Sequence, residues 1–464
     1  MTENQMIART GRVQNWLDDP SDVLPVSCTI TVVEDSMWGT GGITDSWLFT
    51  TYALQNGAGV AIHLYKLRPK GTIGSTGKVA SGPNGFMEVY STINNAVKKG
   101  NRYRQGAVVI HQDLDHPDIM EFLTMGRDKL QWVKRCVSIT QQTWDSASAD
   151  VRNELLKGIA RGDIWLGKID YDQNGHRLHL NVCLEVRILN RGTCLLQHIN
   201  VSGGQVEDIP QAFADGMTQL VNLHGITGVD RDGWYRSPGE DRQVGLGMLG
   251  LANLLSLERV TYAQFADALE LHLGSTADLL VTPEATRIVK ALAEGIDKAA
   301  AIAKKAGMDR AFSIAPTASC SYRYKDRAGF TTAPEIAPPI GRVVDRDSSM
   351  LGVTTVSYGD VETAEMVGFD TYFRAVNGIC ELLTITGLFH GYSFNSWSDC
   401  VTYDEAFVQR WLDSPQTSLY YSLQVKQNTQ AKDDAMVALD DMFEELGLVN
   451  EDFADDDICL SCAE

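Results

Sequence analysis

Strand-like and helix-like segments alternate along most of this chain, and that alternation constrains its fold more than any other feature. Residues 28–33 and 107–110 are apolar, β-branched runs typical of strands. Residues 86–97 carry apolar side chains at helical spacing, and residues 283–306 form the clearest helical pattern, with Thr and Pro at its start. Residues 245–255 are apolar nearly all round, which predicts a buried helix. Together these segments predict an α/β fold with parallel strands.

The charge of the chain divides it into two parts. The 464 residues carry a formal net charge of −20, and residues 433–464 hold 12 Asp and Glu with no Lys or Arg. We therefore expect one large domain over residues 1–432 and an acidic tail over residues 433–464. An acidic chain is repelled by nucleic acid and by anionic membranes, so neither is expected as a partner.

The ends and the cysteine count give further expectations. Residues 1–19 lack the basic-then-apolar pattern of a signal peptide, and no run reaches the ~18 apolar residues that cross a bilayer. We therefore expect a cytoplasmic protein. The nine cysteines are an odd number, which argues against a secreted disulfide framework. Only one close cysteine pair exists, so no structural metal site is expected.

The most informative segment is Asn181-Val182-Cys183-Leu184-Glu185-Val186, in which polar and apolar residues alternate. In an extended segment, Asn181, Cys183 and Glu185 lie on one face. An amide, a thiol and a carboxylate would then be neighbours, offering a hydrogen-bond anchor, a redox-active sulfur and a base. The alternative is a half-exposed strand that carries these polar residues by chance.

Four other cysteines are candidates for redox chemistry. Cys28 and Cys194 lie in strand-like runs, where a cysteine is also common as a small buried hydrophobe. Cys459 and Cys462 form a Cys-x-x-Cys two residues before the end of the chain. An accessible dithiol on a mobile arm suits thiol–disulfide exchange, and the alternative is an end with incidental cysteines.

Other segments suit phosphate or aromatic contacts. The hydroxyl-rich segment 315–321, the glycine-rich segment 56–60 and the basic segment 98–106 can each approach an anion, although each is also an ordinary turn. Tyr420 and Tyr421 are adjacent aromatic residues, which are usually strand packing.

In this order, from about Val26 to the C-terminus, these segments resemble the catalytic (large) subunit of ribonucleotide reductase. The resemblance implies a ten-stranded α/β barrel in which two five-stranded parallel halves pack antiparallel around a central finger loop. Its most specific segments are Asn181-x-Cys183-x-Glu185, Cys28, Cys194, residues 113–119, residues 245–251 and the terminal dithiol.

The resemblance also implies roles for these residues. Cys183 matches the thiyl-radical cysteine that abstracts the ribose 3′-hydrogen, Glu185 the base at the 3′-hydroxyl, and Asn181 the amide that binds the substrate hydroxyls. Cys28 and Cys194 match the pair that reduces the 2′-position. The remaining matches are the swinging dithiol, Cys459 and Cys462, and the stacked tyrosines of a radical relay, Tyr420 and Tyr421.

Two groups of binding residues follow from the same resemblance. The substrate phosphates and sugar are expected at Ser27, Ala58, Gly59, Pro316, Thr317 and Ser319. A deoxynucleoside triphosphate effector is expected at Asp35, Ser36 and Arg68, with Arg102 and Arg104 in the loop that relays effector identity. The N-terminal ATP-binding cone domain of many relatives is expected to be absent.

The resemblance predicts that the radical comes from a ferritin-like small subunit, so that this chain binds no cofactor tightly. The alternative is adenosylcobalamin bound to this chain. Further expected partners are a ribonucleotide substrate, thioredoxin or glutaredoxin, and a second copy of the chain in an effector-promoted homodimer. Two other functions remain open: an inactive nucleotide-binding regulator, and a general dithiol reductase that uses only Cys459 and Cys462.

Overall fold

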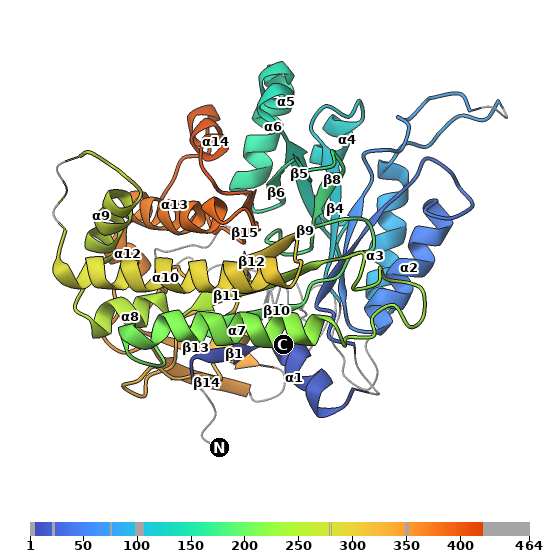
Figure 1. Cartoon of the computed structure of the whole chain (residues 1–464). Helices are drawn as coiled ribbons and strands as arrows, with labels where there is room; N and C mark the ends of the chain where they lie inside the picture. Colours follow the sequence, from blue (N-terminus) through green and yellow to red (C-terminus); the bar gives the residue numbers. More distant parts are fainter. Residues whose placement is uncertain are drawn as a thin grey trace.

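Two sheets of mostly parallel strands form the centre of the molecule (Figure 1). The computed structural model describes residues 5–20, 24–74, 77–97, 106–277, 279, 281–348 and 352–420. The first sheet has the order β16-β6-β5-β4-β3-β2, with bounds Ser418–Leu419, Ile164–Lys168, Lys134–Ile139, Val108–Asp113, Gly59–His63 and Cys28–Val32. The second has the order β1-β10-β11-β12-β15, with bounds Ile7–Arg9, Leu196–Asn200, Gln243–Leu249, Arg310–Ile314 and Phe389–Tyr392.

Side chains of the first sheet alternate between two separate apolar clusters. Ala61, Val109 and Trp165 belong to a small cluster that also contains Cys183, whereas their neighbours along the strands belong to the large cluster. Successive residues of a strand point to opposite faces, so the small cluster lies on one face of this sheet and the large cluster on the other. Strands buried on both faces read as continuous apolar runs, which explains why residues 28–33 and 107–110 could be predicted.

The two sheets meet at two seams. At the β2 edge, Thr29 forms an antiparallel bridge with Thr193, just before β10. At the β6 edge, β16 pairs antiparallel with β6, and the amide of Tyr420 then donates to the carbonyl of Phe394 beyond β15, at 3.0 Å. These contacts wrap the two sheets around the small apolar cluster.

A hairpin inserts between the sheets and carries the segment that the sequence singled out. A three-stranded antiparallel unit has the order β7-β8-β9, with bounds Asp170–Tyr171, Arg177–Leu180 and Arg187–Ile188. Leu180 pairs with Arg187, so residues 181–186 are the loop of the β8–β9 hairpin. A separate hairpin, β13 (Val343–Ser348) and β14 (Gly352–Ser357), lies outside the two sheets.

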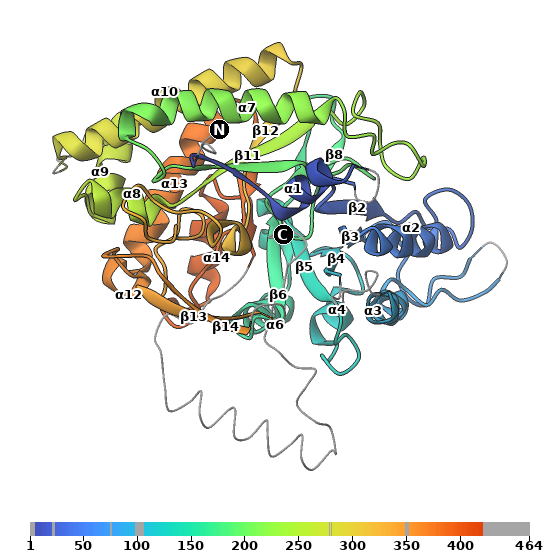
Figure 2. The same cartoon turned by 90° about the horizontal axis from the view of Figure 1, so that it is seen from below.

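Helices cover the outer faces of the sheets. Figure 2 shows the long helices α7 and α10 running side by side over the second sheet, while α2 and α3 lie beside the first. The bounds are α1 Gly11–Asp18, α2 Ile43–Gln55, α3 Met87–Ala96, α4 Ile119–Thr124, α5 Gln141–Ser146, α6 Ala149–Ala160, α7 Ile209–His224, α8 Leu251–Leu257, α9 Tyr262–His272, α10 Pro283–Lys305, α11 Ala318–Ser321, α12 Ala364–Val367, α13 Phe369–Ile385 and α14 Glu405–Leu412. Helix α10 begins as predicted, because the Thr282 side chain accepts from the amide of Ala285.

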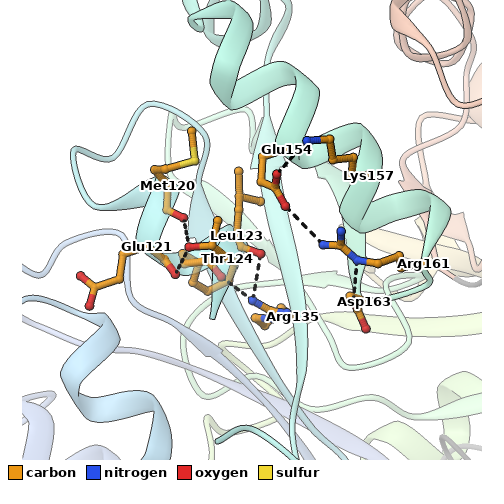
Figure 3. A network of polar contacts seen from close by, with 10 residues as sticks. Met120, Glu121, Leu123, Thr124, Arg135, Glu154, Lys157, Arg161 and Asp163 are labelled. Carbon is orange, nitrogen blue, oxygen red and sulfur yellow. Dashed lines mark hydrogen bonds and ion pairs between the residues drawn. The ribbon is translucent and has the colours of Figure 1, made fainter. Parts of the chain in front are cut away.

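Buried polar groups tie the helices of the first half to its strands. Figure 3 shows the Arg135 guanidinium on β5 donating to the carbonyl of Leu123 near the end of α4. The same guanidinium also donates to the carbonyl of Phe122. Close by, Arg161 pairs with Glu154 of α6 and with Asp163 just before β6. Arg135 is almost fully buried, so these carbonyls supply the partners that water would otherwise provide.

The α/β class is confirmed, but two details differ from prediction. Residues 245–255 are not one helix: they are the end of β11 and the start of α8, divided at Gly250, whose φ is +80°. An apolar run cannot distinguish a buried strand from a buried helix. The halves are also unequal, since five strands run parallel in the first sheet and four in the second, where β1 is antiparallel.

In the described part of the chain, no helix is long and apolar enough to cross a membrane. Tyr421, Cys459, Cys462, Arg102 and Arg104 lie outside the described residues, as does the whole of the predicted tail 433–464.

Candidate active site

The loop at residues 181–186 is a tight turn held by both backbone and side-chain hydrogen bonds of one residue. The amide of Asn181 donates to the carbonyl of Val186 at 3.0 Å, and the Val186 amide donates back to the Asn181 side-chain oxygen at 3.1 Å. Leu184 adopts φ +63°, which a non-glycine residue rarely does. The predicted extended geometry is therefore wrong, because the chain must reverse direction between β8 and β9.

The turn nevertheless brings the predicted side chains together. The Asn181 amide nitrogen donates to Glu185 Oε1 at 3.0 Å and to Cys194 Sγ at 3.4 Å. An amide nitrogen carries two protons, so it can serve both acceptors at once. Cys183, which lies between Asn181 and Glu185 in the sequence, is fully buried in the small apolar cluster.

Cys28 and Cys194 are adjacent across the first seam. The Cys194 amide donates to the Cys28 carbonyl at 2.9 Å, and both residues are buried thiols. Burial raises the pKa of the Cys194 thiol well above its usual value, and a hydrogen bond with Cys28 raises it further. Both cysteines share the small apolar cluster with Cys183. Cys28, Cys183 and Cys194 thus share a space lined by apolar side chains, and Cys136 on β5 is a fourth thiol of this cluster.

Glu185 is the acid–base group of this cluster. Burial, and then the nearby Cys28 thiol, raise its pKa to about 8, although hydrogen bonds from Asn181 and Ser393 oppose the rise. A carboxyl group with such a pKa exchanges protons near neutral pH, which suits general acid–base chemistry.

Ser393 is a site residue that sequence reasoning missed. Its hydroxyl lies 2.7 Å from the Cys183 carbonyl and 3.3 Å from Glu185 Oε2. It follows β15, more than 200 positions after the loop it contacts. One serine in a segment that also contains Ser396 and Ser398 gives no local signal, so only the fold could reveal it.

The predicted substrate residues gather near these thiols at the ends of β2, β3 and β12. Gly59 pairs with Cys28 in register, and its amide donates to the Ser27 carbonyl at 2.8 Å, with Ala58 adjacent. Pro316, Thr317 and Ser319 follow β12 through Ala315, which belongs to the small cluster. Thr317 is fixed by Glu335, whose carboxylate accepts from the Thr317 amide at 3.2 Å.

Two of the predicted effector residues form an exposed pair. The Arg68 Nε donates to Asp35 Oδ2 at 2.7 Å, and the Arg68 amide donates to Asp35 Oδ1 at 3.2 Å. The Ser36 hydroxyl instead donates to the Trp38 carbonyl at 2.7 Å. An effector site there stays a prediction.

Tyr420 is buried against the small cluster. Its ring centroid lies 4.7 Å from that of Trp165 on β6. This contact places Tyr420 at the second seam, and its predicted relay role stays a prediction.

Three buried histidines support the base of the loop. The rings of His63 and His111 are stacked with centroids 4.1 Å apart, and the edge of His179 meets His63 at 4.8 Å. His63 Nε2 lies 3.0 Å from the Leu180 carbonyl, so it must carry the proton and donate. Burial lowers the pKa of His111 and of His179 to about 3, with the Arg177 cation contributing, so these rings are neutral at pH 7. In the described ranges, no cluster of three or more His, Cys, Asp or Glu is placed to hold a metal ion.

Comparison with known proteins identifies this architecture. Residues 26–160 match the family model for the ribonucleotide reductase barrel domain. The chain has the fold of the ribonucleotide reductase barrel domain. The Actinobacillus ureae class Id ribonucleotide reductase alpha subunit shares the fold, with a TM-score of 0.61 over 90% of this chain and 87% of that one, at 16% sequence identity.

Curated proteins similar to this chain include two vitamin B12-dependent ribonucleoside-diphosphate reductases. One, from Thermoplasma acidophilum, is 26% identical over 309 residues, which are 58% of this chain and 39% of that protein. Another, from Mycobacterium tuberculosis, is 27% identical over 291 residues, which are 52% of this chain and 40% of that protein. The chain thus spans about two fifths of the length of these relatives.

These names overturn the predicted cofactor status. The resemblance predicted a chain that binds no cofactor tightly and receives its radical from a small subunit. That prediction is wrong, because the curated relatives are named as vitamin B12-dependent enzymes, which points to adenosylcobalamin. The prediction had relied on the adjacent Tyr420 and Tyr421. Tyr420 packs against Trp165 and Tyr421 lies outside the described residues, so the relay role of the pair stays a prediction.

The raised pKa of Glu185 predicts a stability change in Glu185→Gln. The pKa of Glu185 is about 8 in the folded protein and 4.5 in the unfolded chain. The neutral carboxyl group therefore contributes fully to the free energy of unfolding below pH 4.5, and this contribution is lost as the pH rises from 4.5 through 8. We expect the variant to be more stable than the wild type at pH 7 by about 3 kcal/mol, and equally stable near pH 4.5. Urea unfolding at several pH values measures this difference. The exposed Glu294→Gln is the control, and a pH-independent difference would contradict the account.

The histidine cluster predicts the opposite pH dependence. An unfolded chain protonates His111 near pH 6.5, whereas the folded protein does so only near pH 3, so stability is lost as the pH falls between these values. Neither ring nitrogen of His111 has a hydrogen-bond partner among the described residues. We compare the free energy of unfolding of His111→Leu with that of the wild type in urea at two pH values. The difference should shift in favour of the variant by about 2 kcal/mol between pH 8 and pH 5. The exposed His272→Leu should show no such trend; a parallel trend in both variants would refute this assignment.

Proposed function

We propose that this chain is the catalytic component of a ribonucleotide reductase that uses adenosylcobalamin as its radical source. The observation that carries the proposal is the hairpin loop, which brings Cys183 and Glu185 into the same buried cluster as Cys28 and Cys194. A dead regulator would not need this set of three thiols and a tuned carboxyl group. A general dithiol reductase would use only Cys459 and Cys462 and would not require the buried residues of the barrel.

The residues of the loop fit the chemistry of the cofactor. When bound, adenosylcobalamin supplies an organic radical that must take a hydrogen atom from the protein. Cys183 would face it, because its thiol lies at the tip of the hairpin, fully buried among Leu184, Val186 and other apolar side chains. Such surroundings keep water and oxidants away from a reactive sulfur.

In the proposed reaction, the Cys183 sulfur radical takes the 3′-hydrogen of the ribose, and Glu185 accepts the proton of the 3′-hydroxyl. The 2′-hydroxyl then leaves as water. Cys28 and Cys194 provide two electrons and two protons and become a disulfide, after which the 3′-hydrogen returns from Cys183. The net change converts one ribonucleotide and two thiols into one deoxyribonucleotide, one water and one disulfide.

Further parts of the proposal rest on the resemblance. Ser27, Gly59 and the segment 315–321 would bind the substrate, and Asn181 would orient its hydroxyls. Cys459 and Cys462 would re-reduce the Cys28–Cys194 disulfide and be reduced in turn by thioredoxin or glutaredoxin. A deoxynucleoside triphosphate at Asp35 and Arg68 would select the substrate and promote a homodimer.

Reconstitution of the purified chain tests this function. With adenosylcobalamin, dithiothreitol and a ribonucleoside di- or triphosphate, the wild type should form deoxyribonucleotide, and Cys183→Ala should lose at least about a thousandfold in rate, because no other residue can take its place. Cys136→Ala is the matched control, since Cys136 is a buried thiol of the same cluster with no assigned role.

Two outcomes would contradict the proposal in different ways. Equal turnover by Cys183→Ala and the wild type would exclude the thiyl mechanism. Turnover that appears only when a separate radical-generating subunit is added would exclude adenosylcobalamin as the radical source.

A further inference from the structure

The end of β15 contacts two parts of the candidate active site: the loop 181–186 and, through Glu335, the predicted substrate segment 315–321. Residues 392 and 393 are consecutive, and successive side chains of a strand project to opposite sides. The Ser393 hydroxyl reaches the Cys183 carbonyl at 2.7 Å and Glu185 Oε2 at 3.3 Å. Its amide donates to the Ile314 carbonyl at 3.1 Å, at the point where β12 enters the predicted substrate segment 315–321.

Tyr392 reaches that segment through a buried carboxyl group. Its hydroxyl donates to Glu335 Oε2 at 3.3 Å and lies 3.0 Å from the hydroxyl of Tyr372. Glu335 Oε1 accepts from the Thr317 amide at 3.2 Å, and the Glu335 amide donates to Thr317 Oγ1 at 2.8 Å. Tyr392 thus secures Glu335, whose side chain accepts from the Thr317 amide and whose backbone amide donates to the Thr317 hydroxyl.

The backbone of Glu335 indicates that this arrangement is enforced. Glu335 adopts φ +53°, which is unfavourable for a residue with a Cβ atom and persists where the surrounding contacts over-determine it. Both Tyr392 and Ser393 are fully buried, so water does not compete for their hydroxyl groups. Hydrogen bonds in such surroundings fix geometry more firmly than exposed ones do.

We propose that Tyr392 and Ser393 are paired positioning residues: Ser393 fixes the loop that carries Cys183 and Glu185, and Tyr392, through Glu335, fixes the segment 315–321. This inference rests on the proposed function for its catalytic meaning. One dipeptide on a parallel strand then sets the relative position of the radical thiol and the bound substrate. Ser393 acts on the chemical step, and Tyr392 acts on substrate binding.

Hydrogen–deuterium exchange of the full chain, without substrate or cofactor, tests the positioning directly. Ser393→Ala should speed exchange of the amides in 181–186 about tenfold, the factor that corresponds to one lost hydrogen bond. Tyr392→Phe keeps the ring and should speed exchange in 315–321 instead. Ser396→Ala is the matched control, because this buried serine of the same segment bonds to the hydroxyl of Tyr403 and not to the site.

Steady-state kinetics supply the second readout. Ser393→Ala should lower kcat about tenfold with KM within twofold and alter the pH profile of turnover, whereas Tyr392→Phe should raise KM with little change in kcat. The inference is overturned if Ser393→Ala and Ser396→Ala exchange alike over 181–186, or if Tyr392→Phe leaves exchange over 315–321 unchanged. If the wild type fails to turn over with any radical source, the proposed function fails, while the exchange experiment still decides the positioning.

Discussion

The structure depends on one constraint: a polar hairpin loop must be accommodated inside an apolar enclosure. Asn181 meets it by using its backbone amide and its side-chain oxygen to close the turn onto Val186, while its side-chain nitrogen serves Glu185 and Cys194. The same residue therefore folds the loop and assembles the site. A buried polar group without such partners would cost several kcal/mol, so the fold and the site are stabilised by the same hydrogen bonds.

Burial also sets the chemistry. It is the largest cause of the raised pKa of both Glu185 and Cys194, and of the lowered pKa of the histidines beneath the loop. The pKa of Glu185 is thereby brought close to neutral pH, where the carboxyl group can both donate and accept a proton. The neutral histidines avoid placing additional cations beside Arg177. The pH dependence of stability and the reactivity of the site thus have one physical origin, the exclusion of water by the two sheets.

Much of this could be predicted from local sequence, and the rest could not. The strand at Cys28 and the helix from Pro283 follow from apolar runs and a capping residue. Asn181 and Glu185 are hydrogen-bonded neighbours as alternation suggested, although the predicted extended backbone was wrong. Alternation specifies neighbours in a strand, but a tight turn can also bring alternate residues together. The strand within 245–255 was missed because apolar runs have no diagnostic period, and Ser393 was missed because its contact is created by the topology alone. The source of the radical could not be derived from a pair of tyrosines, since adjacent aromatic residues pack in many seams.

The central claim is that Cys183, Cys28 and Cys194 act together in one buried cluster. The most direct test is a single turnover by the full chain without added reductant, with adenosylcobalamin and a ribonucleotide, followed by mapping of disulfides by mass spectrometry. The account predicts a Cys28–Cys194 disulfide in an amount equal to the deoxyribonucleotide formed, or the equivalent Cys459–Cys462 disulfide after exchange, and neither in Cys183→Ala. Product without either disulfide, or the same disulfide yield in Cys183→Ala, would contradict it.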